Sequence, residues 1–197
     1  MAAKRTCRIT RDSTVFLQCD IQELAKPKMW NMQSVLFVAK MMAHAAHVMD
    51  IPLVVSEHIP EKLGRTVEEV RNAWRKPPTL LIQKFNFTMC CPELFQVLEG
   101  KKSVVLYGVE THVCVQHTCL ELLELGFEVH ILVDGVTSMY PVARSAAIAR
   151  MRDAGATVET YESVLTEICS DMNDPKAQIV GQYAMKNRQK EPLMPSL

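Results

Sequence analysis

Short apolar runs alternate with longer amphipathic segments along the 197-residue chain. The short runs are rich in β-branched residues and are bounded by polar residues or glycine, which predicts strands buried in a sheet. The longer segments repeat apolar residues every three or four positions, which predicts helices with one buried face. The predicted strands are Thr14–Cys19, Leu53–Val55, Thr79–Gln83, Val104–Tyr107, Phe127–Val133 and Thr157–Thr160.

The predicted helices are Ser34–Met49, Thr66–Trp74, Pro92–Leu98, Val115–Leu125, Pro141–Ala154, Glu162–Cys169 and Pro175–Met185. Thr66 and Glu69 have the spacing of a capping box, and Ile59–Gly64 is predicted to be a loop. Strands alternate with helices without hairpin signals, which indicates parallel strands joined by helical crossovers. We therefore expect a three-layer α/β/α doubly wound domain with a mainly parallel sheet of about six strands. The expected single domain spans residues 1–197, with a core over 14–181 and a polar tail over 186–197.

The composition is that of an ordinary globular protein, with 48% hydrophobic and 22% charged residues. The formal net charge is zero, which argues against nucleic acid or an acidic membrane as the partner. The longest apolar run falls short of the roughly 20 residues that a membrane helix needs. Residues 1–11 lack the apolar stretch of a secretory signal, which favours the cytoplasm. Lys4, Arg5, Arg8 and Arg11 precede every acidic residue, so mitochondrial import stays open.

The chain has seven cysteines, an odd number, and most of them fall in predicted core elements. This pattern indicates free thiols in a reducing compartment and argues against a disulfide framework.

Cys114 follows the predicted strand Val104–Tyr107 and the turn that begins at Gly108. It stands where the next helix is predicted to begin. Unpaired N–H groups and the helix dipole both favour a thiolate at such a position. Cys114 is therefore a candidate nucleophile, and the alternative is a small buried hydrophobic residue.

Asp20 and Lys84 also follow predicted strands, the first and the third. In an open parallel sheet, ligands bind at the carboxyl ends of the strands, where the strand order reverses. We therefore expect Asp20, Lys84 and Cys114 to face one crevice. A carboxylate can accept the thiol proton there, and an ammonium group stabilises both anions.

Three segments carry a resemblance to a known family: Val15–Gln22, Lys84–Thr88 and Gly108–Val115. In this order, they resemble the isochorismatase-like cysteine hydrolases, which include nicotinamidases. The loop Glu57–Gly64 resembles the eukaryotic branch of isochorismatase domain-containing proteins.

The resemblance implies that Cys114 is the nucleophile, Asp20 the general base and Lys84 the cation that balances them. It also implies a cis peptide bond between Val109 and Glu110. The N–H groups of Glu110 and Cys114 would then form an oxyanion hole. The implied reaction is hydrolysis of a C–N bond in a small amide or imide through a cysteine acyl-enzyme.

Two features separate the chain from relatives with other chemistry. Nicotinamidases bind a metal through an Asp-x-His pair and a further histidine after the second strand, whereas this chain has Ser56-Glu57-His58 there. We therefore predict neither a metal nor any other cofactor. Isochorismatase itself lacks the cysteine, so Cys114 argues against that activity.

Gln22, Phe85, Phe87 and His112 are the candidate substrate-binding residues, with packing in the core as the alternative for the phenylalanines. The expected partner is a small molecule. A homo-oligomer, either a dimer or a tetramer, is also expected, with Gly135–Pro141 and the polar tail contacting the neighbour. Two alternatives to the hydrolase remain: a non-catalytic binding or regulatory protein with this fold, and an RNA-associated factor or nuclease.

Overall fold

A parallel sheet forms the middle layer of the protein in a computed structural model that describes residues 8–187. Within these residues, six strands pair in the order β3-β2-β1-β4-β5-β6, all in parallel. The strands are β1 (Thr14–Cys19), β2 (Leu53–His58), β3 (Leu80–Lys84), β4 (Ser103–Val109), β5 (Glu128–Thr137) and β6 (Thr157–Glu159). The predicted doubly wound α/β fold is confirmed. Lys4, Arg5 and the tail from residue 188 onward lie outside the described residues.

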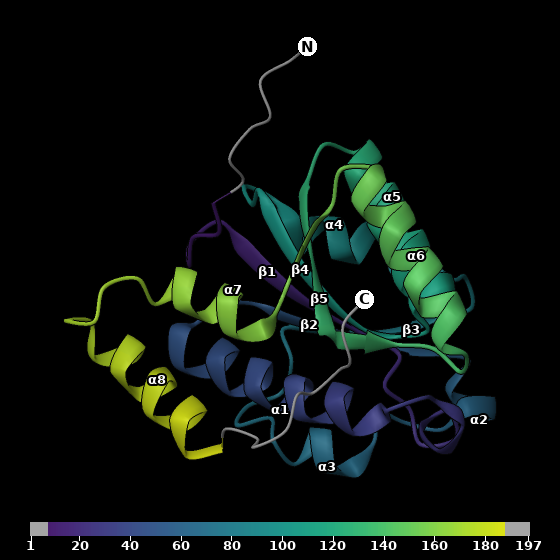
Figure 1. Cartoon of the computed structure of the whole chain (residues 1–197), viewed down its shortest axis with the longest axis horizontal. Helices are drawn as coiled ribbons and strands as arrows, with labels where there is room; N and C mark the ends of the chain where they lie inside the picture. Colours follow the sequence, from purple (N-terminus) through teal and green to yellow (C-terminus); the bar gives the residue numbers. More distant parts are fainter. Residues whose placement is uncertain (1–7, 188–197) are drawn as a thin grey trace.

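Helices cover both faces of the sheet (Figure 1). One layer contains α4 (Pro92–Leu98), α5 (Gln116–Glu124) and α6 (Pro141–Asp153). The other contains α1 (Met32–Met49), α3 (Glu68–Arg71), α7 (Tyr161–Ile168) and α8 (Pro175–Asn187). Three short helical segments complete the described chain: η1 (Lys26–Lys28), α2 (Pro60–Leu63) and η2 (Thr111–Val115).

The side chains of β1 and β4 divide the core into two parts. Both strands are buried along their whole length, as expected for central strands of a parallel sheet. Alternate residues point to opposite faces, so Phe16 and Tyr107 pack in the cluster that contains α1. Leu17 and Leu106 pack with residues of α4, α5 and α6. The centre of the sheet is therefore fixed from both sides.

The strand order reverses between β1 and β4. The chain crosses from β1 to β2 and β3 on one side, and then returns to β4 on the other side of β1. Gly108 pairs with Cys19 at the carboxyl ends of these two strands. It has a φ of +127°, and a Cβ atom there would lie 2.0 Å from the carbonyl oxygen of Cys19. Only glycine permits this close approach at the reversal point.

Three local predictions were wrong. Ile59–Gly64 contains the short helix α2 and is not a continuous loop. Thr66 does not cap α3, because Val67 occupies the N-cap position and no side chain caps the helix. The Thr66 N–H and hydroxyl instead donate to the Glu57 carboxylate, at 2.7 and 3.0 Å. Strand β5 continues past Val133 to Thr137, and its pairing with β4 shifts register between Leu106 and Gly108.

The extension of β5 changes the surface that was predicted to contact a neighbouring subunit. Gly135 to Ser138 are buried inside the chain, whereas Met139, Tyr140 and Val142 are exposed.

No helix in the described part of the chain combines the length and apolarity required to cross a bilayer.

Candidate active site

Asp20 lies directly after β1, at the carboxyl edge of the sheet. Its φ is 49°, in the left-handed region that Asp adopts more readily than most residues. The side chain is buried and accepts three hydrogen bonds, the longest of them from Cys19 Sγ. Ser56 Oγ donates to Oδ1 at 2.7 Å, and Lys84 Nζ donates to Oδ2 at 2.7 Å. The carboxylate is thus held by partners from β2 and β3.

Lys84 is the last residue of β3 and is also buried. Besides the bond to Asp20, its ammonium group donates to the carbonyl oxygens of Asn86 and Phe87, at 3.2 and 2.9 Å. Burial acts to lower the pKa of Lys84, but attraction to the acidic groups around it outweighs burial and raises the pKa. The side chain is therefore a fixed cation whose three protons all have acceptors in the protein.

Cys114 lies in η2, the π-helical turn that leads into α5. The helical structure thus begins at Thr111, three residues before the cysteine. The Cys114 carbonyl accepts a hydrogen bond from Thr118 Oγ1 at 2.7 Å, and Thr118 Oγ1 accepts one from Met89 N–H at 3.0 Å. Cys114 is 6% exposed. Its backbone is thus tied to the segment that follows β3.

The peptide bond between Val109 and Glu110 is cis, as the family resemblance implied. It joins the end of β4 to η2. The Glu110 carbonyl accepts hydrogen bonds from the N–H groups of Val113 and Val115, at 3.1 and 3.3 Å. The Glu110 side chain also accepts a bond from Met139 N–H at 2.9 Å. The backbone on which Cys114 stands is therefore held from two directions.

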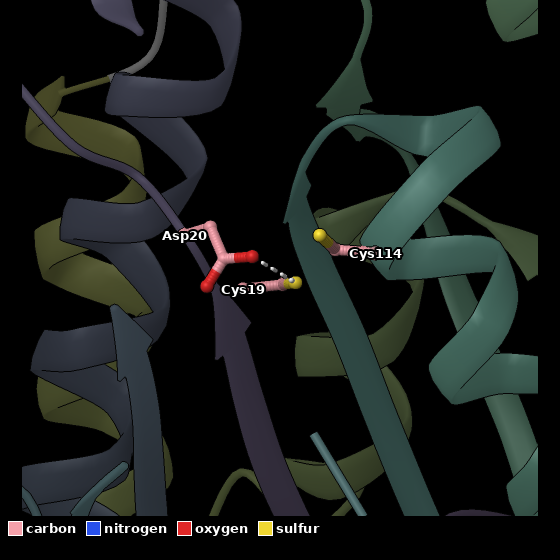
Figure 2. A group of neighbouring side chains, drawn as sticks. All are labelled: Cys19, Asp20 and Cys114. Carbon is pink, nitrogen blue, oxygen red and sulfur yellow. Dashed lines mark hydrogen bonds between the residues drawn. The ribbon is translucent and has the colours of Figure 1, made fainter. Parts of the chain in front are cut away.

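The structure places a second thiol beside Asp20 and Cys114 (Figure 2). Cys19 Sγ, Cys114 Sγ and a carboxylate oxygen of Asp20 all lie within 4.8 Å of one another. Cys19 Sγ donates to Asp20 Oδ2 at 3.5 Å. Burial, a hydrogen bond with Cys114 and the nearby Asp20 carboxylate raise the pKa of Cys19 well above its usual value. The position of Cys19 inside the first apolar run gave no indication of a place at the site.

A pocket of about 270 Å³ opens above Asp20 and Cys114. Most of its wall is apolar. Its lining residues are Asp20, Gln22, Leu24, Ala25, Lys28, Met29, His58, Leu63, Phe87, Val109, Glu110, Val113, Cys114 and Met139. The volume lies just below the range of about 300–1,000 Å³ typical of ligand sites. The pocket therefore suits a small molecule.

Two of the four candidate substrate-binding residues line this pocket. The Phe87 ring contacts the rings of His58 and His117, with centroids 5.8 and 5.5 Å away. Gln22 is fully buried, and its amide is engaged by the protein. It donates to the carbonyls of His58 and Gly64 at 3.0 and 2.7 Å, and accepts from His58 N–H at 2.9 Å. Gln22 thus joins two parts of the pocket wall.

Phe85 and His112 are not among the residues that line this pocket. Phe85 is 71% exposed and lies beside a separate surface hollow along β3. The His112 ring pairs Nδ1 with Ser138 Oγ at 3.0 Å. These two side chains therefore do not line the pocket that contains Cys114.

His58 is a pocket residue that the sequence analysis did not select for substrate binding. It ends β2 and contacts Phe87. Burial, and then the nearby Lys84 ammonium, lower the pKa of His58. The ring is therefore neutral at pH 7. Its position at the end of a parallel strand, like that of Asp20, is the signal that could have identified it.

Among the described residues, Cys19, Asp20 and Cys114 form a group with the spacing to hold a metal ion. The surroundings do not fit a cation. Lys84 Nζ lies 2.7 Å from Asp20 Oδ2, so a metal would face a buried ammonium group. Ser56 already donates to the other oxygen of Asp20. The positive charge of Lys84 favours a thiolate at this site and disfavours a metal cation.

Comparisons with known proteins identify the family of the chain. The isochorismatase domain matches residues 14–163. The secreted isochorismatase effector Isc1 of Phytophthora sojae is 34% identical over 185 residues, which are 91% of this chain and 88% of that protein. Isochorismatase domain-containing protein 1 of Danio rerio is 40% identical over 167 residues, which are 83% of this chain and 58% of that protein.

A solved structure of MAR1 ribonuclease from Caenorhabditis elegans superposes with a TM-score of 0.90 at 29% sequence identity. The alignment covers 97% of this chain and 99% of that one. The doubly wound α/β fold is that of the isochorismatase-family hydrolases. The chain belongs to the isochorismatase family.

Proposed function

We propose that the protein is a metal-independent cysteine hydrolase that cleaves a C–N bond of a small amide or imide. Cys114 is the nucleophile, Asp20 the general base and Lys84 the balancing cation. The observation that carries this proposal is the position of Cys114 Sγ within 4.8 Å of the Asp20 carboxylate at the base of the pocket. A nucleophile, a base and a group that orients the base are the three parts that such catalysis requires.

The first half of the reaction forms a thioester. Asp20 accepts the proton of the Cys114 thiol, and the sulfur adds to the substrate carbonyl carbon. The N–H groups of Glu110 and Cys114 are the proposed donors to the resulting oxyanion. When the C–N bond breaks, the leaving nitrogen takes the proton from Asp20. Lys84 keeps its charge throughout and stabilises the Asp20 carboxylate.

The second half of the reaction releases the acid. Asp20 accepts a proton from water, and the hydroxide adds to the thioester carbonyl. The C–S bond breaks, and the sulfur of Cys114 leaves with the proton that Asp20 held. The product is a carboxylic acid, and the thiol and carboxylate return to their starting state.

The pocket favours a neutral substrate. Its wall is mostly apolar, and the protons of Lys84 are already bound to Asp20, Asn86 and Phe87. Lys84 is therefore not available to bind a substrate carboxylate. Lys28 is the one lysine or arginine among the residues that line the pocket. A small amide or cyclic imide with an apolar body fits these walls best.

The test combines thiol reactivity with a substrate panel. The full chain is incubated with small neutral amides, cyclic imides and isochorismate, and its intact mass is then measured after acid quenching. We expect an acyl adduct on Cys114 with at least one amide or imide, and no adduct in Cys114→Ala. Cys91→Ala is the matched control, because Cys91 is a half-buried free thiol outside this pocket.

If the panel contains no substrate of the protein, the rate of alkylation by iodoacetamide at pH 7 tests the hydrolase proposal. A hydrolase site requires Cys114 to react faster than Cys91 and to slow in Asp20→Asn. Equal rates for the two thiols, together with no adduct, would favour the non-catalytic binding protein.

The likeness to a MAR1 ribonuclease supports a second candidate, a ribonuclease. RNA binding relies on lysine and arginine contacts to phosphates, yet this chain has no net charge. The test is cleavage of a single-stranded RNA at increasing salt. Cleavage that requires Cys114 or Lys84 would replace the amidase proposal, and cleavage that survives both substitutions would indicate a contaminant.

We also propose that the chain forms a homo-oligomer. Met139, Tyr140 and Val142 are exposed apolar side chains, and Met139 also lines the pocket. A second copy that covers them would remove apolar surface from water next to the site. Light scattering at micromolar concentration should give at least a dimer, and the mass should fall in Val142→Glu. A monomeric parent protein contradicts this proposal.

A further inference from the structure

Cys19 is a buried thiol at the site to which the hydrolytic reaction assigns no role. It ends β1, is 0% exposed, and contacts both Asp20 and Cys114. Figure 2 shows its sulfur and that of Cys114 on facing elements, with the Asp20 carboxylate beside them. A second sulfur this close to a nucleophilic thiol permits a chemistry that one cysteine cannot perform.

We propose that Cys114 and Cys19 form a redox pair in which a hydroperoxide oxidises Cys114 and Cys19 then closes a disulfide with it. The disulfide reversibly blocks the nucleophile. The claim that activity is switched off rests on the proposed hydrolase function, whereas the oxidation itself does not.

Access determines which thiol reacts first. Cys114 lines the pocket and is 6% exposed, so a molecule as small as hydrogen peroxide can reach it. Cys19 is 0% exposed and is not among the lining residues. The raised pKa of Cys19 keeps it a neutral thiol, which is a poor nucleophile toward peroxide. Cys114 is therefore the residue that meets the oxidant, and Cys19 is the residue that resolves the product.

The reaction balances in two steps. Asp20 first accepts the proton of Cys114, and the sulfur attacks one peroxide oxygen. The O–O bond breaks, the sulfur becomes a sulfenic acid, and the departing oxygen takes the proton back from Asp20 to leave as an alcohol or water. Cys19 sulfur then attacks Cys114 sulfur, and the S–O bond breaks. The hydroxide leaves with the proton of Cys19 as water, so two thiols are oxidised and one hydroperoxide is reduced.

The sulfurs of Cys19 and Cys114 are close enough to form a disulfide after a small movement. The two sulfurs lie within 4.8 Å of each other, and a disulfide requires about 2.05 Å. A change of side-chain rotamer moves a cysteine sulfur by about 3 Å, which covers the difference. The Cys19 backbone is fixed against Gly108, so the movement falls to the two side chains and to η2.

Peroxide treatment of the reduced full-length chain tests the proposal. Remaining thiols are blocked with N-ethylmaleimide, and peptides are mapped without reduction. We expect a Cys19–Cys114 linked peptide, about 2 Da lighter than the two thiol peptides together, that dithiothreitol separates. In Cys19→Ser, Cys114 should instead accumulate sulfinic acid that dithiothreitol does not reverse. Cys119→Ala is the matched control, because Cys119 is another buried cysteine near Cys114, and it should still form the linked peptide.

Irreversible oxidation of Cys114 in the parent protein, without a link to Cys19, would overturn the proposal. The proposal would also be overturned if Cys114 stays reduced while half-buried Cys91 is oxidised. The readout is separate from hydrolysis. A linked peptide in a protein that hydrolyses nothing would refute the proposed function alone, and a hydrolase that forms no linked peptide would refute the redox pair alone. Both parent-protein outcomes remain decisive if Cys19→Ser fails to fold.

Discussion

Lys84 Nζ lies 2.7 Å from Asp20 Oδ2, and each of the two side chains is 6% exposed. The ion pair is therefore removed from water, where an unpaired charge would be costly. Two residues 64 positions apart in sequence thus pair their opposite charges inside the protein.

Lys84→Met should leave the Asp20 carboxylate buried without its cation. We expect a loss of about 3–5 kcal/mol in the free energy of unfolding, measured by urea denaturation. The double variant Asp20→Asn/Lys84→Met removes both charges and should recover much of that loss. Hydrolysis should be absent from both variants. A double variant no more stable than Lys84→Met would show that the cost comes from packing.

Gly108→Ala should destabilise the fold by at least about 3 kcal/mol. The added Cβ would meet the carbonyl oxygen of Cys19 at 2.0 Å, and backbone atoms in two central strands cannot move aside easily. The matched control is Gly181→Ala in α8, where an added Cβ meets nothing within 4 Å. That change should stabilise the protein by about 1 kcal/mol, because glycine is a poor helix former. Thermal denaturation of both variants checks the prediction.

Phe87→Ala should lower kcat/KM about five- to tenfold by removing an apolar wall of the pocket. The Lys84 ammonium binds the Phe87 carbonyl, so the backbone contact is kept. Phe85→Ala is the control, since Phe85 lies outside this pocket and is 71% exposed. It should leave kcat/KM within about twofold of the parent. Equal losses in the two variants would contradict the assigned pocket.

Acid should loosen the contact between α1 and α8. The His44 ring stacks on Tyr183, with centroids 3.8 Å apart and planes 18° from parallel. Burial, followed by Arg75 and His47, lowers the pKa of His44 from its ordinary value of 6.5. Below pH 6.5 the unfolded state therefore binds more protons than the folded state, and stability falls as pH falls.

Hydrogen exchange of α8 at pH 7.0 and 5.5, corrected for intrinsic rates, measures this effect. Protection should drop at the lower pH in the parent chain. His44→Phe keeps an aromatic ring against Tyr183 but does not titrate, so its protection should change less. An unchanged pH response in His44→Phe would assign the effect to another group.

The parallel sheet, and the approach of three candidate site residues to one edge of it, could be predicted from the sequence for one physical reason. Parallel strands bring their carboxyl ends to a common edge, so Asp20, Lys84 and the turn before Cys114 had to approach one another. The apolar runs located these strand ends to within a few residues. The longer β5 was missed because Asp134 and Gly135, which resemble a turn in sequence, are buried within the strand.

Cys19 was missed because strand alternation places consecutive side chains on opposite faces. Asp20 breaks that alternation with its left-handed backbone, which brings its carboxylate to Cys19 Sγ. Phe85 and Phe87 could not be separated for a similar reason. Both follow β3, and the turn that the carbonyls of Asn86 and Phe87 make around Lys84 decides which ring enters the pocket. Such turns depend on tertiary contacts that periodicity does not encode.

The position of β3 at an edge of the sheet determines how the protein loses activity on heating. β3 is one of the two edge strands of the described sheet, and it holds one half of the buried ion pair. Edge elements open in local fluctuations at lower free energy than a central strand such as β1. Each opening would withdraw Lys84 from Asp20 while the rest of the sheet stays intact. Heat inactivation should therefore begin below the temperature at which the fold melts, and cooling should restore activity.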